Sequence, residues 1–571
     1  MKQTLVLALV LVMVLIAACA APTAAPTAVP PTKAPEPTKA PAAEPTKAPA
    51  PTSAPAATTA PAATKAPEPT KAPEPTKAAA PAAGTPKMGG TLTFAMKEDV
   101  TSMDPLKANQ YGDIRLSILV AQQLVAPDRS GKFVGVLAES WKTDDGKVWT
   151  FNLRKGVKFH NGQEMTSADV KWIFDRILDE KAGTLMRGTY AGIGLKTEIV
   201  DPSTIKFTIA SASGPFLNYL ALLNRSAIIH KDSYNADGTV TKIIGTGPFM
   251  MDTSKPGDSY TLKKFPDYWK KGEPYLNGVV LKVITDPNAR LNAIRTGDVD
   301  MTEELPYADV KKLTEKQDAN FTTNVYYINS GERFVMNTKR EPFSNKNARL
   351  AVEYVFDRAM YNDAIFFGLG QVHNQPFAKT DGWYLDVPMV KTDLAKAKDY
   401  FKASGLPQGT KVKAMLMANQ KDRTELLQAM LSQIGFTVEF NVVDSAAWNK
   451  QGAAYDYDIL IGTMTGIFDP DRPYGYLEKA SGSNWLVGGY DSPQMADLLA
   501  KGRAEADVNK RKEIYKQVVQ LVQDDAATIY VAGLPWSEAW RNSVKGYKSG
   551  TSPALMMMDA SDGLNVTWLD K

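Results

Sequence analysis

The chain has 571 residues, a formal net charge of +4, one cysteine and three histidines. A single cysteine excludes an internal disulfide, so the fold must depend on a hydrophobic core, which a chain of this length can supply. Part of the positive charge lies in a proline- and lysine-rich stretch near the N-terminus. The remainder is nearly neutral, which argues against nucleic acid as a partner.

Residues 1–18 have the organisation of an export signal. Lys2 precedes an apolar run at residues 5–16 that is too short to cross the hydrocarbon core of a bilayer. Residues 15–19 (LIAAC) resemble a bacterial lipobox, in which the cysteine becomes the new N-terminus and carries lipid. Several acyl chains on Cys19 would anchor the protein stably to a membrane. The alternative is an ordinary secretory signal with Cys19 beside the cleavage site by chance.

Residues 19–87 form a second segment, in which residues 21–86 repeat variants of PTKAPEPTKAP. Proline fixes φ and withholds a backbone N–H, and almost no residue here is large and apolar, so no core can form. An extended chain at about 3.1 Å per residue reaches at most on the order of 200 Å. We predict a disordered spacer; the alternative is a proline-rich recognition segment, although no aromatic anchor interrupts the repeats.

From Met88 the composition becomes that of a globular protein. Three segments have the pattern of strands, with alternating or continuous apolar side chains: residues 91–96, 148–153 and 279–284. Residues 144–147 (DDGK) predict the turn before the second of them. Nearly five hundred residues without another low-complexity break are consistent with two or three lobes.

Helices are predicted with equal clarity. Residues 166–169 (TSAD) have the pattern of a capped helix start, and apolar residues then recur at i, i+3, i+4, i+7 and i+8. They are Val170, Ile173, Phe174, Ile177 and Leu178. Ile514, Val518, Leu521 and Val522 repeat this spacing near the C-terminus. Strands and helices together predict an α/β or α+β fold.

Motifs of common enzymes are absent from the sequence, namely GxxxxGK[ST], HExxH and GxSxG. His160, His230 and His373 lie far apart, and none has a second ligand type at metal spacing. Asp469 and Asp471 flank Pro470 and could in principle serve a glycosidase, whereas an Asp-Pro turn is the structural alternative. We predict that the protein is not an enzyme and has no cofactor or metal site.

Residues 137–176 (LAESWKTDDGKVWTFNLRKGVKFHNGQEMTSADVKWIFDR) resemble the signature block of the family 5 solute-binding proteins. These are the peptide, dipeptide and nickel receptors of ABC importers. Further blocks follow in the family's order: residues 245–249 (GTGPF), 265–269 (FPDYW), 289–300 (ARLNAIRTGDVD), 336–338 (MNT) with 342–343 (PF), 349–358 (RLAVEYVFDR), 456–458 (DYD) and 469–471 (DPD). The resemblance covers residues 88–571.

The resemblance implies a class II periplasmic-binding-protein fold, with two lobes around a ligand cleft and an extra subdomain in lobe I. We expect lobe I at residues 88–326, lobe II at 327–534 and a return to lobe I at 535–571, with the subdomain at about 130–205. The chain would cross between lobes near residues 326–330 and 533–537. Closure about these crossings would engulf the ligand.

One departure from the family bears on the ligand. In its dipeptide and oligopeptide receptors, an aspartate before the DPD motif pairs with the peptide's N-terminal amine; the matching position here is Gly466. A buried ammonium without a partner is costly, so a free amine would need another carboxylate. Asp469 and Asp471 are the candidates, although their role in the family looks structural.

Further ligand-binding candidates follow from the same resemblance. Arg423, before a helix expected at residues 424–434, is similar in position to the arginine that binds a peptide carboxylate; a solvated arginine is the alternative. Trp485 and Asn484 lie in residues 481–490 (SGSNWLVGGY), which resemble a segment that faces the cleft. Trp448 and Trp536 could reach the cleft or the hinge, or belong to the core.

Taken with the export signal, the resemblance predicts a monomeric receptor of an ABC importer, outside the cytoplasm in the periplasm or at the cell surface. Lipid on Cys19 would anchor it to the membrane. It would capture a peptide or peptide-like solute and deliver it to the permease. Aromatic residues without a fixed charge for an amine would also suit an oligosaccharide. A surface hydrolase and a cell-wall adhesive module are the alternatives from other classes.

Overall fold

The computed structural model describes residues 85–128, 131–379, 381–464, 469–479, 481, 483–549 and 563–571. All of them belong to one compact unit, residues 79–571. The predicted export signal, most of the spacer, Cys19 and Gly466 lie outside the described residues. Within the described ranges, no helix has both the length and the apolar composition that a membrane span requires.

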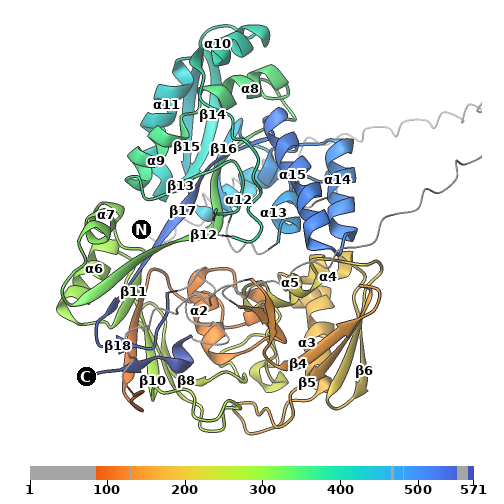
Figure 1. The fold of residues 1–571 in the computed structure, drawn as a ribbon, viewed down its shortest axis with the longest axis vertical. Helices are drawn as coiled ribbons and strands as arrows, with labels where there is room; N and C mark the ends of the chain where they lie inside the picture. Colours follow the sequence, from red (N-terminus) through yellow and green to blue (C-terminus); the bar gives the residue numbers. More distant parts are fainter. Residues whose placement is uncertain are drawn as a thin grey trace, which may run out of the picture. The chain divides into compact units, whose positions relative to one another are not determined.

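An eleven-stranded sheet runs through the described unit (Figure 1). Its order is β15 (Phe436–Val443), β14 (Thr410–Met417), β16 (Ile459–Met464), β12 (Phe321–Met336), β17 (Thr528–Arg541), β11 (Met301–Glu303), β1 (Thr91–Met96), β10 (Gly278–Val283), β9 (Ser259–Lys264) and β8 (Phe249–Lys255). The short β13 (Gln371–Val372) also pairs with β17.

The long strands β12 and β17 join the two ends of this sheet. They pair antiparallel from Phe321 opposite Arg541 to Val335 opposite Thr528. At one end β17 pairs with β11, and at the other β12 pairs with β16. The ladder is irregular between Tyr327 and Gly331, where the two strands stop matching residue for residue.

Apolar side chains gather in separate cores on the two sides of these strands. One side, which we call lobe I, holds a large core from residues 92–281 and 544–569, together with Met301, and a smaller core between α6 (Pro287–Thr296) and α7 (Tyr307–Glu315). The other side, lobe II, holds three cores from residues 334–532. Tyr326 and Trp536 form a small cluster of their own.

Lobe I contains strands and helices that the sequence patterns of the N-terminal half predict. A separate four-stranded sheet has the order β4 (Ala138–Thr143), β5 (Val148–Leu153), β7 (Thr204–Thr208) and β6 (Lys196–Asp201). Gly146 has a φ of +69° in the β4–β5 turn, a conformation that glycine adopts without strain. Trp149, Phe151 and Leu153 are buried from β5, as their alternation predicts.

The remaining elements of lobe I surround these two sheets. They are α2 (Tyr111–Val120), α3 (Ser167–Leu178), α4 (Arg187–Gly192), α5 (Phe216–Ala221) and the pairs β2 (Val125–Pro127) with β3 (Phe133–Gly135) and β18 (Val544–Lys545) with β19 (Trp568–Leu569). The predicted start of α3 is confirmed, because Thr166 and Asp169 form a reciprocal capping box.

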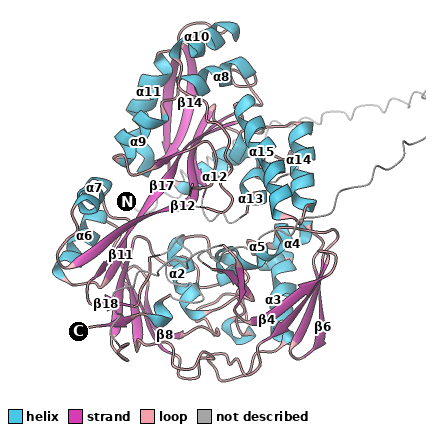
Figure 2. Ribbon diagram, viewed as in Figure 1, coloured by secondary structure: helices cyan, strands magenta, loops and turns pink. Residues whose placement is uncertain are grey.

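Lobe II packs helices on both faces of its part of the sheet (Figure 2). Phe334 and Met336 of β12 join the core that contains α8 (Lys346–Val355), α9 (Arg358–Phe366), α10 (Leu394–Ala403) and α11 (Thr424–Ser432). Val335 points to the opposite face and packs against α12 (Ser445–Ala453). The remaining helices are α13 (Asp471–Gly475), α14 (Pro493–Ala504) and α15 (Val508–Asp524). The mixed α/β class is thus confirmed.

Candidate functional site

Aromatic and charged groups gather on the lobe I ends of the crossing strands. Tyr326 of β12 lies opposite Trp536 of β17, and both are buried. The Tyr111 ring packs edge-on to Trp536 at 5.0 Å between centroids. Lys97 Nζ lies 4.6 Å from the centre of the Trp536 ring and pairs with Glu304 at 2.8 Å. The strands therefore carry an aromatic surface with polar groups beside it, at the point where the lobes join.

Direct contacts also join the lobes away from the strands. Tyr219 of α5 donates its hydroxyl proton to Asp471 at 2.6 Å. The backbone N–H of Gly214 donates to the carbonyl of Arg503 at 3.1 Å. Burial, followed by the Asp471 carboxylate, raises the pKa of Tyr219 well above its ordinary value, so the phenol keeps this proton. These bonds hold the region around α5 against α13 and α14.

Arg423, predicted to bind a carboxylate, already has anionic partners. Its Nε donates to Glu332 of β12 at 3.0 Å and its Nη1 to Asp422 at 2.5 Å. Tyr361 of α9 also donates to Glu332, at 2.8 Å. Although burial alone would lower the pKa of Arg423, the Glu332 carboxylate raises it above the ordinary value. The positive charge of this arginine is therefore balanced within lobe II.

Asp469 and Asp471 are likewise engaged. Arg511 of α15 donates Nη1 and Nη2 to the two oxygens of Asp469, at 2.5 and 2.7 Å. Arg503 of α14 donates to Asp471 at 2.9 Å. Asp469 also accepts the backbone N–H of Asp471 at 2.9 Å, which closes the turn into α13. The predicted Asp-Pro turn is confirmed, and the two carboxylates hold α13, α14 and α15 together.

Asn484 and Trp485 lie side by side but in different environments. Asn484 is buried and donates to the carbonyls of Tyr476 and Tyr490, at 2.9 and 3.0 Å. Trp485 is partly exposed and packs edge-on to Trp448, at 5.2 Å between ring centroids. A Cβ at Gly452 would lie 2.3 Å from the Trp485 indole, so the ring occupies space that only glycine leaves open.

The structure therefore does not gather the predicted residues around one vacant pocket. Asn484 and Trp485 are adjacent, whereas the side chains of Arg423 and Asp469 are bound by separate partners. Gly466 lies outside the described residues. The partner that sequence reasoning missed is Glu332, which is fully buried. The sequence contains a signal for a buried charge here, because two consecutive charged residues, Glu332 and Arg333, directly precede the apolar residues 334–336 (FVM).

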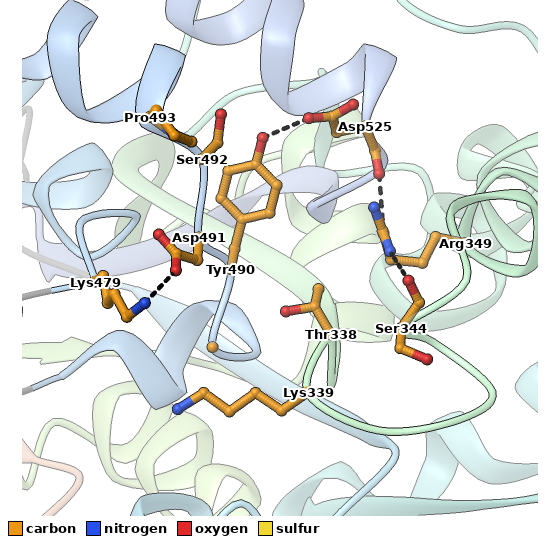
Figure 3. A pocket seen from close by; sticks show the side chains of 11 residues that line it. Thr338, Lys339, Ser344, Arg349, Lys479, Tyr490, Asp491, Ser492, Pro493 and Asp525 are labelled. Atoms are coloured by element: carbon orange, nitrogen blue, oxygen red, sulfur yellow. Dashed lines mark hydrogen bonds and ion pairs between the residues drawn. The ribbon is translucent and has the colours of Figure 1, made fainter. Parts of the chain in front are cut away.

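A pocket of about 490 Å³ lies within lobe II, near the start of α14 (Figure 3). Lys479 and Asp491 line it and pair at 2.6 Å. Tyr490 donates to Asp525 there, and Arg349 is held by backbone carbonyls. None of the predicted ligand-binding residues lines this pocket. Within the described ranges, no three histidine or acidic side chains are grouped as ligands for a metal ion.

Comparison with known proteins gives consistent similarities over most of the chain. Residues 132–485 match the model of the bacterial extracellular solute-binding proteins, family 5 (middle). Di/tripeptide-binding protein 1 of Pseudomonas aeruginosa is 27% identical over 504 residues, which cover 80% of this chain and 91% of that protein. The glutathione-binding protein GsiB of Salmonella choleraesuis is 28% identical over 451 residues, 76% of this chain and 87% of that protein.

A solved structure shows the same fold. The periplasmic binding protein DppA of Helicobacter pylori, in complex with the peptide STSA, superposes with a TM-score of 0.74. It is 26% identical and covers 85% of this chain and 99% of its own. The similarity confirms the predicted two-lobe fold, in which β12 and β17 connect the lobes.

Proposed function

Since this chain belongs to family 5 of the bacterial extracellular solute-binding proteins, we propose that it captures a peptide or peptide-like solute between its lobes for an ABC importer. The observation that carries the proposal is the similarity to a peptide-bound receptor over 85% of this chain and 99% of that one. The di/tripeptide-binding relative supports the same class of solute. A receptor of this kind delivers its solute without chemical change, so we propose no catalytic residue.

The lobe boundaries form part of the proposal. We assign residues 88–326 and 535–571 to lobe I, 327–534 to lobe II and about 130–205 to an inserted subdomain. The irregular pairing between Tyr327 and Gly331 supports the first crossing, because a break in the ladder lets paired strands bend. The separate sheet of β4, β5, β6 and β7 supports the subdomain.

Trp485 is the residue that we propose to contact the solute. It is partly exposed, and Trp448 and Gly452 fix the position of its ring. A rigid indole offers a large apolar face at little cost in conformational entropy. Arg423, Asn484 and Asp469 would support the binding site indirectly rather than contact the solute, because their polar atoms already have partners. Any contact at Gly466 would be through the backbone.

Binding is tested by thermal unfolding and isothermal titration with short peptides. We expect peptides to raise the unfolding midpoint and to reduce the radius of gyration as the lobes close. Trp485→Ala should weaken binding about 10- to 100-fold, as is typical of an aromatic anchor. Trp141→Ala is the matched control, because this partly buried tryptophan lies on β4. If no peptide shifts the midpoint, peptides are not the solute.

Membrane attachment is a separate proposal, which rests on the lipobox resemblance at residues 15–19. Lipid on Cys19 would hold the receptor at the membrane, and the spacer would let it reach its permease at high local concentration. Cys19→Ser should move the protein from the membrane fraction to the soluble fraction and leave its affinity for peptides unchanged. A Cys19→Ser protein that stays with the membrane would contradict lipid anchoring.

A further inference from the structure

Lobe I and lobe II contact each other directly at a place away from their connecting strands. In Figure 1, α5 lies next to α13 and α14, to the right of the crossing strands β12 and β17. Tyr219 of α5 donates its hydroxyl proton to Asp471, the first residue of α13. The backbone N–H of Gly214 donates to the carbonyl of Arg503, in the last turn of α14. We call these two hydrogen bonds the interlobe latch.

Arg503 of lobe II takes part in both contacts. The last carbonyl groups of a helix have no partner inside that helix, so Gly214 of lobe I supplies a hydrogen bond that α14 cannot make for itself. The Arg503 guanidinium donates to Asp471 at 2.9 Å and to Glu478 at 3.1 Å. Arg503 therefore also fixes the carboxylate that accepts the hydroxyl proton of Tyr219.

Gly214 lies against lobe II with no room for a side chain. A Cβ at this position would lie 2.9 Å from the carbonyl oxygen of Glu505 and 3.3 Å from Nε of Arg511. The φ of Gly214 lies outside the left-handed range, so alanine could adopt the same backbone conformation. The close approach of lobe II is therefore what requires glycine here.

The two surfaces of the latch are each fixed within their own lobe. On the side of lobe I, Phe216 of α5 packs against Trp149 and Phe207, at 5.2 and 6.1 Å between ring centroids. On the side of lobe II, the buried pair of Asp469 and Arg511 holds α13 against α15. Neither surface can move without the rest of its lobe, so the latch forms when the lobes close and breaks when they separate.

The side chains of the latch are shielded from water. Tyr219 is 7% exposed and Asp471 is 6% exposed. A hydrogen bond to a charged acceptor contributes more to stability than one between neutral groups, and water competes poorly for a buried acceptor. The contact between the lobes therefore contributes its own free energy to closure.

We propose that the interlobe latch stabilises the closed arrangement of the lobes independently of the solute. The solute then supplies only part of the free energy of closure, so the latch raises the affinity for every solute by the same factor. Release of a solute requires the same two hydrogen bonds to break. The inference goes beyond the proposed function, because it concerns the two lobes alone and specifies no solute.

Tyr219→Phe removes the hydroxyl of the latch and keeps the aromatic ring. In the full-length protein without added peptide, we expect the ratio of closed to open molecules to fall about 10-fold. Hydrogen exchange at the Gly214 amide should become about 10-fold faster, because its acceptor lies in the other lobe. Tyr260→Phe is the matched control: this buried tyrosine donates to Asp99 at 2.7 Å within lobe I, so exchange at Gly214 should stay unchanged.

Gly214→Ala tests the latch by a second route, because its methyl group would collide with lobe II while the hydroxyl of the latch stays in place. Spin labels at Val200→Cys of β6 and Gln517→Cys of α15, both exposed, measure the distance between the lobes in a Cys19→Ser protein. We expect both latch variants to gain a population at longer distance. Gly188→Ala is the control, because a Cβ there meets no atom within 4 Å.

The outcomes separate this inference from the proposed function, because every measurement is made without a solute. If Tyr219→Phe matches wild type in exchange at Gly214 and in the distance distribution, the inference is wrong. Faster exchange with an unchanged distance distribution would also overturn it, because only the segment around Gly214 would then have loosened. Peptides that fail to bind, while Tyr219→Phe opens the lobes, would overturn the proposed function and support the latch.

Discussion

Asp469→Asn is expected to lower the free energy of unfolding by about 3–5 kcal/mol, because the substitution leaves the Arg511 guanidinium buried without its anion. Asp469 is 5% exposed and Arg511 is 3% exposed, so water cannot replace the lost partner. Two short hydrogen bonds join them, and the Arg511 Nε also donates to the carbonyl of Gly502 at 2.7 Å. Urea denaturation followed by tryptophan fluorescence measures the change.

The matched control for this prediction is Asp491→Asn. Asp491 pairs with Lys479 at 2.6 Å, but both side chains are well exposed, so the loss of stability should be much smaller than that of Asp469→Asn. Combining Asp469→Asn with Arg511→Met should recover part of the lost stability, because no buried charge is then left alone. If Asp469→Asn abolished peptide binding at unchanged stability, Asp469 would be a ligand contact rather than a structural group.

Elements with local signals could be predicted from the sequence. Leu92, Phe94 and Met96 alternate and are fully buried from β1, as the pattern indicated. The helix expected at residues 424–434 is α11, which ends at Ser432. Capping, periodicity and turn chemistry act over a few residues, so one short window contains all the information that they need.

Polar pairs across the fold could not be predicted in the same way. Glu332 and Arg423 are 91 positions apart, and Tyr219 and Asp471 are 252 apart. The sequence around each of these residues gives no sign of its partner. Only the packing of β12 on η5 (Ala418–Arg423), and of α5 on α13, determines which polar residues contact each other. A resemblance can mark Arg423 as a ligand residue, but it does not reveal that Glu332 balances its charge.

Whether a side chain already has hydrogen-bond partners bears on which residues can determine the specificity of solute binding. Predicted candidates such as Asp469 and Asn484 have their hydrogen bonds satisfied by neighbours, so binding a solute there would require those bonds to break. Contact with the partly exposed Trp485 ring requires no such exchange. A solute that presents an apolar face would therefore match the indole surface that the fold leaves available.

Acidification is expected to destabilise the protein through His160 and His373. Burial lowers the pKa of His160 to about 4 and that of His373 to about 3, the latter with a further contribution from Arg358. Unfolded histidine titrates near pH 6.5, so below that pH the unfolded chain takes up protons that the folded protein excludes. Stability is fully present above pH 6.5 and falls as the pH approaches the folded-state values.

The magnitude follows from the difference between folded and unfolded pKa values. At pH 5 each histidine should cost about 2 kcal/mol, or about 4 kcal/mol together, relative to pH 7.5. His373→Leu should halve this pH-dependent loss, whereas the carboxylates contribute equally in both proteins and cancel in the comparison. Urea denaturation at the two pH values measures the effect. Equal losses in His373→Leu and wild type would show that His373 is accessible to protons in the folded state.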